Sequence, residues 1–159
     1  GWRALTVSTC GIVPGIEAFG RDFPQVNLAV SLHAPNDAVR SLLMPINNRY
    51  PIDALLAACR AHATATGRRT TYEYALIRGV NDQESHAREL AQRLAGSLCH
   101  VNLIPLNEVA ETGYGSGDRT TAQLFQKFLE SKGVTTTIRR EMGGDIDAAG
   151  GQLRLRERG

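Results

Sequence analysis

The stretch IDALLAACRAHATATGRRTTYEYALI, residues 52–77, places a strong helix pattern directly before a strand pattern. Apolar residues recur at helical spacing through residues 52–66, at Leu55, Leu56, Cys59 and Ala63. Gly67 follows at the position of a helix C-terminal cap, where a left-handed conformation is common. Residues 70–77 are rich in β-branched and aromatic side chains, which favours a strand. This unit of helix, turn and strand sets the pattern that the rest of the chain repeats.

The same alternation extends to both sides of this stretch. Further strands are predicted at residues 5–9, 26–31, 100–104 and 135–140, and further helices at 14–19, 37–43, 83–94 with Asp82 as its cap, and from 119 or 120 to 132. Such alternation favours parallel strands joined by right-handed crossovers, with helices on the outer face. A complete eight-unit barrel needs about 250 residues, and this chain has 159. We therefore predict an α/β fold, a partial (β/α) barrel with mostly parallel strands, with an open sheet as the alternative.

Composition limits the function only loosely. Hydrophobic residues make up 42% of the chain, enough for one ordinary core, and the net charge of +2 is too small to identify a nucleic-acid partner. Cys10, Cys59 and Cys99 are odd in number and far apart, which favours a reduced, cytoplasmic setting. Because three thiolates are too few for an all-cysteine site, no metal site is predicted, and no apolar run predicts a membrane span. The abrupt start at Gly1 is expected of a piece of a longer protein.

Polar residues follow the first two predicted strands. Ser8-Thr9-Cys10-Gly11 ends the first strand, where parallel sheets bind ligands, although a Ser/Thr turn closed by glycine has the same letters. Ser31 and His33 follow the second strand, and period-two geometry predicts that they share a face, from which both could hydrogen-bond one polar ligand. The alternative is that His33 satisfies a backbone group and Asn36-Asp37 caps a helix. A hydrolase-like Ser/His pair is disfavoured because no Gly-x-Ser-x-Gly elbow surrounds Ser31.

Two later positions allow both a ligand and a structural interpretation. Asn107 follows the strand at 100–104, and its amide suits ribose or amino-acid groups, while a turn residue is the simpler interpretation. Glu73 lies between Tyr72 and Tyr74, so it is predicted on the opposite face of its strand. There it either anchors a cationic ligand or pairs with a nearby arginine, for which the candidates are Arg68, Arg69 and Arg78.

Two other groups of residues, one of arginines and one of possible metal ligands, give only weak signals of function. The arginines near the carboxyl end suit a phosphate backbone, but a solvated tail has the same composition; they are Arg139, Arg140, Arg154, Arg156 and Arg158. Cys99 and His100 are adjacent in a predicted strand, so they point to opposite faces and do not form a metal pair.

Taken in order, these motifs resemble one family. They are Ser8-Thr9-Cys10-Gly11 with Val13-Pro14, Ser31-Leu32-His33-Ala34-Pro35-Asn36-Asp37, Pro45-Ile46-Asn47-Asn48, Tyr72-Glu73-Tyr74-Ala75-Leu76-Ile77, Val80-Asn81-Asp82, Asn102-Leu103-Ile104-Pro105-Leu106-Asn107 and the segment from Asp145 to Leu153. The sequence is similar to the carboxyl-terminal part of the radical S-adenosylmethionine (SAM) methyltransferases that act on adenine C2 of 23S ribosomal RNA and transfer RNA.

The resemblance implies a cofactor, a fold and partners. Ser8, Ser31, Leu32, His33 and Asn107 match the positions that contact SAM in that family. The family fold is a partial (β/α) barrel of the radical SAM type, which carries a [4Fe-4S] cluster on a CxxxCxxC loop. The implied division of this chain is a methyltransferase core at residues 1–153 and a basic tail at 154–159, with 23S rRNA and tRNA as partners and no membrane.

Two departures bear on activity. The sequence holds no CxxxCxxC loop, so the cluster ligands are absent from it. The family segment DIDAACGQL reads DIDAAGGQL here, so Gly150 stands at the position of the methyl-carrying cysteine. Because glycine has no nucleophile, this chain is expected to be inactive. The alternative is a noncatalytic SAM-binding or RNA-binding module derived from the family. An unrelated α/β enzyme is the third hypothesis, and self-association through an exposed sheet edge is expected.

Overall fold

The protein is seen in a computed structural model that describes residues 1–106 and 119–139. The strands are β1 (Thr6–Thr9), β2 (Asn27–Ser31), β3 (Thr70–Leu76), β4 (Cys99–Pro105) and β5 (Thr136–Ile138). The α-helices are α1 (Val13–Asp22), α2 (Asp37–Leu43), α3 (Ile52–Thr66), α4 (Glu84–Leu94) and α5 (Arg119–Ser131). Two short 3₁₀-helices are η1 (Trp2–Ala4) and η2 (Pro45–Asn48).

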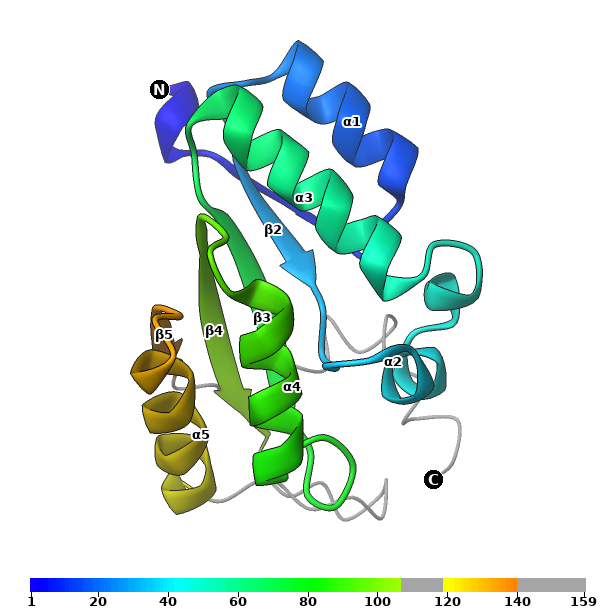
Figure 1. The fold of residues 1–159 in the computed structure, drawn as a ribbon. Coiled ribbons are helices and arrows are strands. Elements are labelled where there is room, and N and C mark those ends of the chain that lie inside the picture. The colour runs from blue at the N-terminus through cyan, green and yellow to red at the C-terminus, as the bar shows by residue number, and fades with distance from the viewer. Residues whose placement is uncertain (107–118, 140–159) are drawn as a thin grey trace.

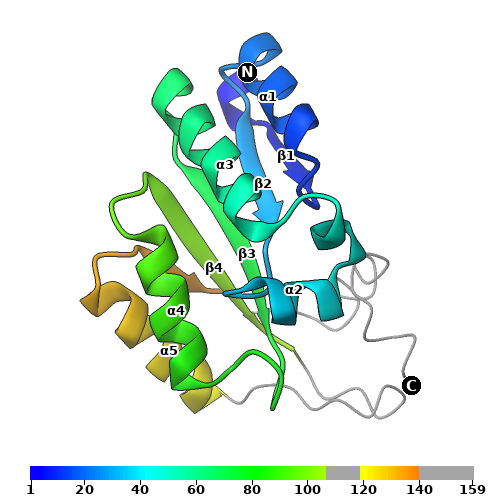
Figure 2. The same ribbon diagram turned by 45° about the vertical axis from the view of Figure 1, so that its right-hand side comes forward.

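The strands form one parallel sheet in the order β1-β2-β3-β4-β5. Consecutive strands are neighbours, and α1, α3, α4 and α5 cover one face of the sheet, as Figures 1 and 2 show. The helix α2 lies beyond the carboxyl end of β2 (Figure 1). This arrangement confirms the predicted α/β fold of partial-barrel type. Within the described residues, β1 pairs on one side only and forms an edge of the sheet.

Most predicted elements are found, with differences at their ends. The bounds of α2 and α3 are those predicted, because each helix has a clear stop in Pro45 or Gly67. The helix α1 is longer than predicted and passes through Gly20. A Cβ atom at Gly20 would lie 2.7 Å from His62 Nδ1, so glycine allows α1 to approach α3 closely. The two 3₁₀-helices were not predicted.

The predicted cap of α4 was wrong by one residue. Gln83 is the N-cap, and its backbone N–H donates to His86 Nδ1 at 3.1 Å in a capping box. Asp82 instead accepts a hydrogen bond from the Gly79 backbone N–H at 3.1 Å, which closes the preceding turn. An aspartate before a helix is a weak boundary signal when it can also serve the turn before it.

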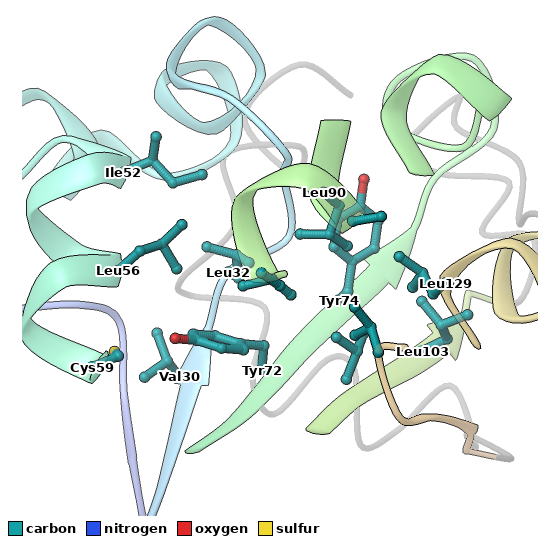
Figure 3. Close-up of a cluster of buried hydrophobic side chains, with 14 of the residues drawn as sticks. Val30, Leu32, Ile52, Leu56, Cys59, Tyr72, Tyr74, Leu90, Leu103 and Leu129 are labelled. Atoms are coloured by element: carbon teal, nitrogen blue, oxygen red, sulfur yellow. The ribbon is translucent and has the colours of Figure 1, made fainter. Parts of the chain in front are cut away.

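The main core lies between the sheet and its helices. Tyr72 and Tyr74 from β3 face this core, as the alternation around Glu73 predicts, and the rings of Tyr74 and Phe125 have centroids 5.2 Å apart. Figure 3 shows the strand and helix side chains that meet there; they include Val30, Leu32, Ile52, Leu56, Cys59, Leu90, Leu103 and Leu129. Burial of apolar area at about 25 cal/mol per Å² stabilises this layer and fixes the register of the strands.

A second, smaller apolar cluster lies under the carboxyl ends of the strands. Its buried members are Leu43, Met44 and Ile77. Because α2 and η2 contribute to it, these two short helices are packed against the end of the sheet. The loops that follow the strands therefore rest on a fixed apolar base.

Candidate functional site

A row of polar side chains crosses the face of the sheet opposite the core. The register aligns Ser31 with Glu73, Glu73 with Asn102, and Asn102 with Thr137. Residues aligned in this way point to the same face. Thr137 Oγ1 donates to Asn102 Oδ1 at 3.0 Å, and His100 Nε2 lies 2.9 Å from Thr137 Oγ1. Donors and acceptors are thus spread across this face, which suits a polar ligand.

The side chain of Glu73 pairs with an arginine that the sequence did not indicate. Arg139 Nη1 lies 3.8 Å from Glu73 Oε2, whereas the sequence pointed to Arg68, Arg69 or Arg78. The reason is the topology, because β5 runs parallel beside β4 and brings residue 139 to the same face. Pairing by sequence proximity failed here because parallel strands join distant parts of a chain.

Ser8 and Ser31 lie on this same face. Ser8 is aligned with Ala29, which is two residues from Ser31 and therefore points the same way. In the loop that follows, the Gly11 backbone N–H donates to Thr9 Oγ1 at 3.1 Å. The turn interpretation is thus confirmed for Thr9 and Gly11, and the Ser8 side chain is exposed at the end of β1.

The His33 ring is held by a hydrogen bond with the backbone of a neighbouring strand. The strand β2 ends at Ser31 and His33 has a positive φ of 58°, so the period-two geometry predicted for Ser31 and His33 does not continue. The Ala75 backbone N–H donates to His33 Nδ1 at 2.9 Å, as the backbone interpretation predicts. Burial, with a smaller contribution from Arg40, lowers the pKa of His33 to about 3. The imidazole is therefore neutral, and its proton is assigned to Nε2.

The loops after β1 and β2 are joined by a buried arginine that sequence reasoning missed. Arg40 Nη2 donates to the backbone oxygens of Cys10 at 2.7 Å and Ser31 at 3.0 Å, and Nε donates to Leu32 O at 3.1 Å. Arg40 Nη1 donates to Asn47 Oδ1 at 3.3 Å. The signal was an arginine on the buried face of α2, three residues before Leu43. A charged residue at such a position is rarely buried without partners.

A buried asparagine joins the loop after β2 to the end of β3. Asn81 Nδ2 donates to the backbone oxygens of His33 at 2.8 Å and Ala75 at 2.7 Å, and the Ile77 N–H donates to Asn81 Oδ1 at 2.8 Å. The hydroxyl of Tyr74 donates to the Asn81 backbone oxygen at 2.7 Å. All these groups are buried, so the Asn81 side-chain amide supplies hydrogen bonds that water would otherwise make with these backbone groups.

Asn36 and Asp37 fix the start of α2. The Val39 N–H donates to Asn36 Oδ1 at 2.9 Å, which confirms the predicted cap. The Ile52 backbone N–H donates to Asp37 Oδ1 at 2.9 Å, and this bond is the largest cause of a lowered pKa for Asp37. Side-chain hydrogen bonds therefore fix the start of α2 and tie it to the start of α3.

The structure thus brings Ser8, Ser31, Leu32 and His33 to the carboxyl edge of the sheet. Leu32 is fully buried with its side chain in the core, its N–H donates to Glu73 O at 3.0 Å and its carbonyl accepts from Arg40, so the structure does not present Leu32 to a ligand. Asn107 and Gly150 lie outside the described residues. Cys99 packs against the core and His100 lies on the polar face, as predicted.

Solved structures define the class of protein to which this fold belongs. A radical SAM methyltransferase from Sphaerobacter thermophilus has a TM-score of 0.87 and 52% identity, and the match covers 98% of this chain and 46% of that one. A domain of pyruvate-formate lyase-activating enzyme from Bacteroides vulgatus shares the fold at 20% identity with a TM-score of 0.65, over 84% of this chain and 80% of that one. The class is that of the radical SAM methyltransferases.

Curated relatives narrow the class. A probable dual-specificity RNA methyltransferase RlmN from Pelotomaculum thermopropionicum is 55% identical over 97% of this chain and 42% of its own length. One from Bacillus cytotoxicus is 54% identical over 99% of this chain and 44% of its own length. The chain therefore belongs to the RlmN family of radical SAM RNA methyltransferases and matches the carboxyl-terminal part of its members. It spans less than half the length of these relatives. No family model matches the chain.

The residues present differ in their fit to the two cofactors of such enzymes. The strand-end hydroxyls, backbone groups and His33 suit the ribose and amino-acid groups of SAM. For the iron–sulfur cluster, no three His, Cys, Asp or Glu side chains within residues 1–106 and 119–139 lie close enough together to hold a metal. Burial raises the pKa of Cys59 to about 11, which disfavours its thiolate. Among the described helices, none has the length and apolar character needed to cross a bilayer.

Proposed function

We propose that this chain is the SAM-binding, carboxyl-terminal part of a radical SAM methyltransferase that methylates C2 of adenine in 23S rRNA and tRNA. Residues 1–153 would form the methyltransferase core and residues 154–159 a basic tail that contacts RNA phosphates. SAM supplies the methyl group in this chemistry, and in longer family members the [4Fe-4S] cluster supplies the electron. Membership in the RlmN family supports the reaction, and a cytoplasmic location accords with it.

The observation that carries this proposal is the meeting of two strand ends. Ser8 on β1 and Ser31 on β2 are brought to one face through the register of β1 with β2. Their hydroxyls can bind the ribose or amino-acid groups of SAM, and the neutral His33 can donate from Nε2. Asn107, which follows β4, would add an amide to the same site. Ligands of parallel α/β sheets bind at this edge.

Calorimetric titration with SAM tests the binding half of the proposal. A Ser8→Ala/Ser31→Ala double variant removes two hydroxyls at the proposed site, and affinity should fall by about 10- to 30-fold, the value of two hydrogen bonds. Ser97→Ala is the matched control, because Ser97 precedes β4 at the opposite edge and should leave affinity unchanged. Equal binding by the wild-type chain and the double variant would reject this site.

Gly150 makes this chain inactive under the proposal. The methyl group in this family travels on a cysteine, and glycine offers no sulfur to carry it. The chain incubated with SAM, a reductant and a 23S rRNA fragment should yield no 2-methyladenosine by mass spectrometry. Within the full parent reading frame, Gly150→Cys should restore methylation if this is the single lesion. Product made by the unaltered chain alone would contradict the proposal.

A noncatalytic SAM-binding or RNA-binding module is the second candidate. Gly150 favours it, since the surrounding segment DIDAAGGQL is otherwise like that of the active family. The parent reading frame discriminates between the two candidates. A CxxxCxxC segment upstream supports the enzyme, and its absence there supports the binding module.

Self-association through β1 is part of the same proposal. Leu5 and Val7, at and beside this edge strand, are 53% and 45% exposed, and Trp2 nearby is 57% exposed. Unpaired strand edges with apolar side chains tend to pair with another chain. Light scattering of the isolated chain should show dimers or larger species, and a monodisperse monomer would contradict this expectation.

A further inference from the structure

We propose that Arg40 is a positioning residue of the candidate SAM site, fixing the loop after β1 relative to the loop after β2. This inference rests on the proposed function for the identity of the ligand. The geometry that supports it involves only residues that the structure describes.

The guanidinium of Arg40 is shared among backbone groups from two strand ends. It donates to Cys10 O, two residues after Ser8, and also to Ser31 O and Leu32 O. Cys10 is 30 positions from Arg40 in sequence, so this contact is a tertiary one. A planar group with fixed donors holds its acceptors in one relative arrangement. The ends of β1 and β2, which carry Ser8 and Ser31, are thereby held in one relative arrangement.

Arg40 is enclosed by its surroundings, and a glycine leaves the space for its guanidinium. Its side chain is 0% exposed, and Gly11 leaves room for it. A Cβ atom at Gly11 would lie 3.1 Å from Arg40 Nη2 and 3.1 Å from Leu55 Cδ2, and Gly11 has a φ of 108° that other residues rarely adopt. Glycine in the first motif therefore serves the close approach of the guanidinium as well as the turn.

An apolar side chain would fill the same space at less electrostatic cost. Burial lowers the pKa of Arg40 to about 10, so the guanidinium is still charged at neutral pH. A buried charge is costly unless its donors are satisfied, and here backbone oxygens satisfy them in place of a carboxylate salt bridge. Asn47, which itself donates to Asp37 Oδ1 at 3.0 Å, takes one further donor. In return for this desolvation cost, the hydrogen bonds of Arg40 hold the loops after β1 and β2 in a single conformation.

The test compares Arg40→Gln and Arg40→Lys with Leu94→Ala in the full chain. Leu94 is 2% exposed at the end of α4, near the amino edge of the sheet, so Leu94→Ala destabilises the fold away from the site. Amide hydrogen exchange is followed by mass spectrometry in peptides spanning residues 9–12 and 31–36, and in peptides spanning 66–70 and 96–99.

Arg40→Gln should accelerate exchange at residues 9–12 and 31–36 by at least about tenfold more than at residues 66–70 and 96–99, because a loss of global stability alone affects all four segments alike. Arg40→Lys, which keeps the charge and part of the reach, should fall between the wild type and Arg40→Gln. Leu94→Ala should show the opposite pattern. Uniform acceleration across all four segments, or no local change, would overturn the positioning role.

SAM titration of the same variants separates the two levels of the proposal. The affinity should fall at least about tenfold in Arg40→Gln and stay within about twofold in Leu94→Ala, at a temperature where both are folded. Unchanged affinity in Arg40→Gln would overturn the inference. If the wild-type chain binds no SAM, the proposed function fails for this chain, and the exchange pattern alone decides whether Arg40 positions the two loops.

Discussion

The two edges of the sheet are held together by different kinds of contact. At the amino edge, the loops that precede β3 and β4 are short, and Arg60 Nε donates to Ser97 Oγ at 3.2 Å in an exposed contact. A hollow of about 220 Å³ opens there beside Tyr72 and Leu98. At the carboxyl edge, buried Arg40 and Asn81 bind the backbone of several strand ends.

The difference lies in how the buried polar groups are used. The amino edge also buries His62, Thr70 and Thr136, but the Arg60–Ser97 contact there is exposed. At the carboxyl edge, buried Arg40 and Asn81 each bind backbone groups of more than one strand end. Buried polar networks are costly, and they fix one conformation when every member is satisfied. The loops at the carboxyl edge are therefore held in one conformation, which agrees with ligand binding at that edge in parallel α/β folds.

Removing the guanidinium should have the largest effect on stability. Arg40→Gln leaves the backbone oxygens of Cys10, Ser31 and Leu32 without this donor. At about 1 to 3 kcal/mol for each unsatisfied group, the free energy of unfolding should fall by about 3 to 5 kcal/mol. Arg60→Gln at the amino edge should change it by less than about 0.5 kcal/mol, because its contacts are exposed. Urea denaturation measures both, and comparable losses would erase the contrast between the edges.

Removing the side-chain amide of Asn81 should have the next largest effect on the free energy of unfolding. In Asn81→Ala, the Ile77 N–H and two backbone oxygens lose their partner, and the expected loss is about 3 kcal/mol. Asn102→Ala on the partly exposed polar face is the matched control, with an expected loss below about 1 kcal/mol. A loss of the same size in the two variants would indicate that burial of the network adds nothing.

Acid should weaken the carboxyl edge through His33. The pKa of His33 is about 3 in the folded protein and 6.5 as the ordinary value, so below pH 6.5 the unfolded chain binds a proton that the folded chain does not. The free energy of unfolding therefore falls as the pH drops from 6.5 toward 4, by about 1.4 kcal/mol per pH unit from this one group.

Denaturation curves of the wild type and His33→Gln between pH 7 and pH 4 measure this dependence. The variant should lose the slope contributed by His33, because glutamine can still accept from the Ala75 N–H without titrating. His62, whose pKa is also lowered by burial, contributes in the same direction in both proteins, so the difference between the two curves is the readout. Identical slopes would show that His33 titrates normally.

The smallest effect compares two tyrosines on one strand. Tyr74→Phe removes the buried hydrogen bond to the Asn81 backbone oxygen, and it should cost about 1 kcal/mol. Tyr72→Phe, whose hydroxyl lies toward Cys59 and the amino edge, should cost less. Thermal denaturation resolves the difference, and a larger loss for Tyr72→Phe would reverse the comparison.

The sequence was sufficient to predict the strands, the α-helices and their order, but not the two 3₁₀-helices. Apolar spacing and clear stops located α2 and α3, and alternating residues placed Glu73 opposite Tyr72 and Tyr74. Two contacts were beyond sequence reasoning: Arg40 with Cys10, and Arg139 with Glu73. Both join segments that only the parallel topology brings together, and neither has a local spacing that marks it.

The candidate site was predicted as a set of positions and not as a geometry. Ser8, Ser31 and His33 were placed at strand ends because polar residues follow apolar runs there. The positive φ of His33 was missed, since a histidine in that conformation has no sequence signature. The roles of these residues toward SAM stay predictions, as do those of Asn107 and Gly150.

Amide hydrogen exchange can map whether SAM binds at the carboxyl edge of the sheet. Exchange of the wild-type chain is compared with and without saturating SAM. SAM should protect residues 8–11 and 31–36 and leave residues 66–70 and 96–99 unchanged. Protection confined to the amino edge, or none at any strand end, would contradict binding at the carboxyl edge.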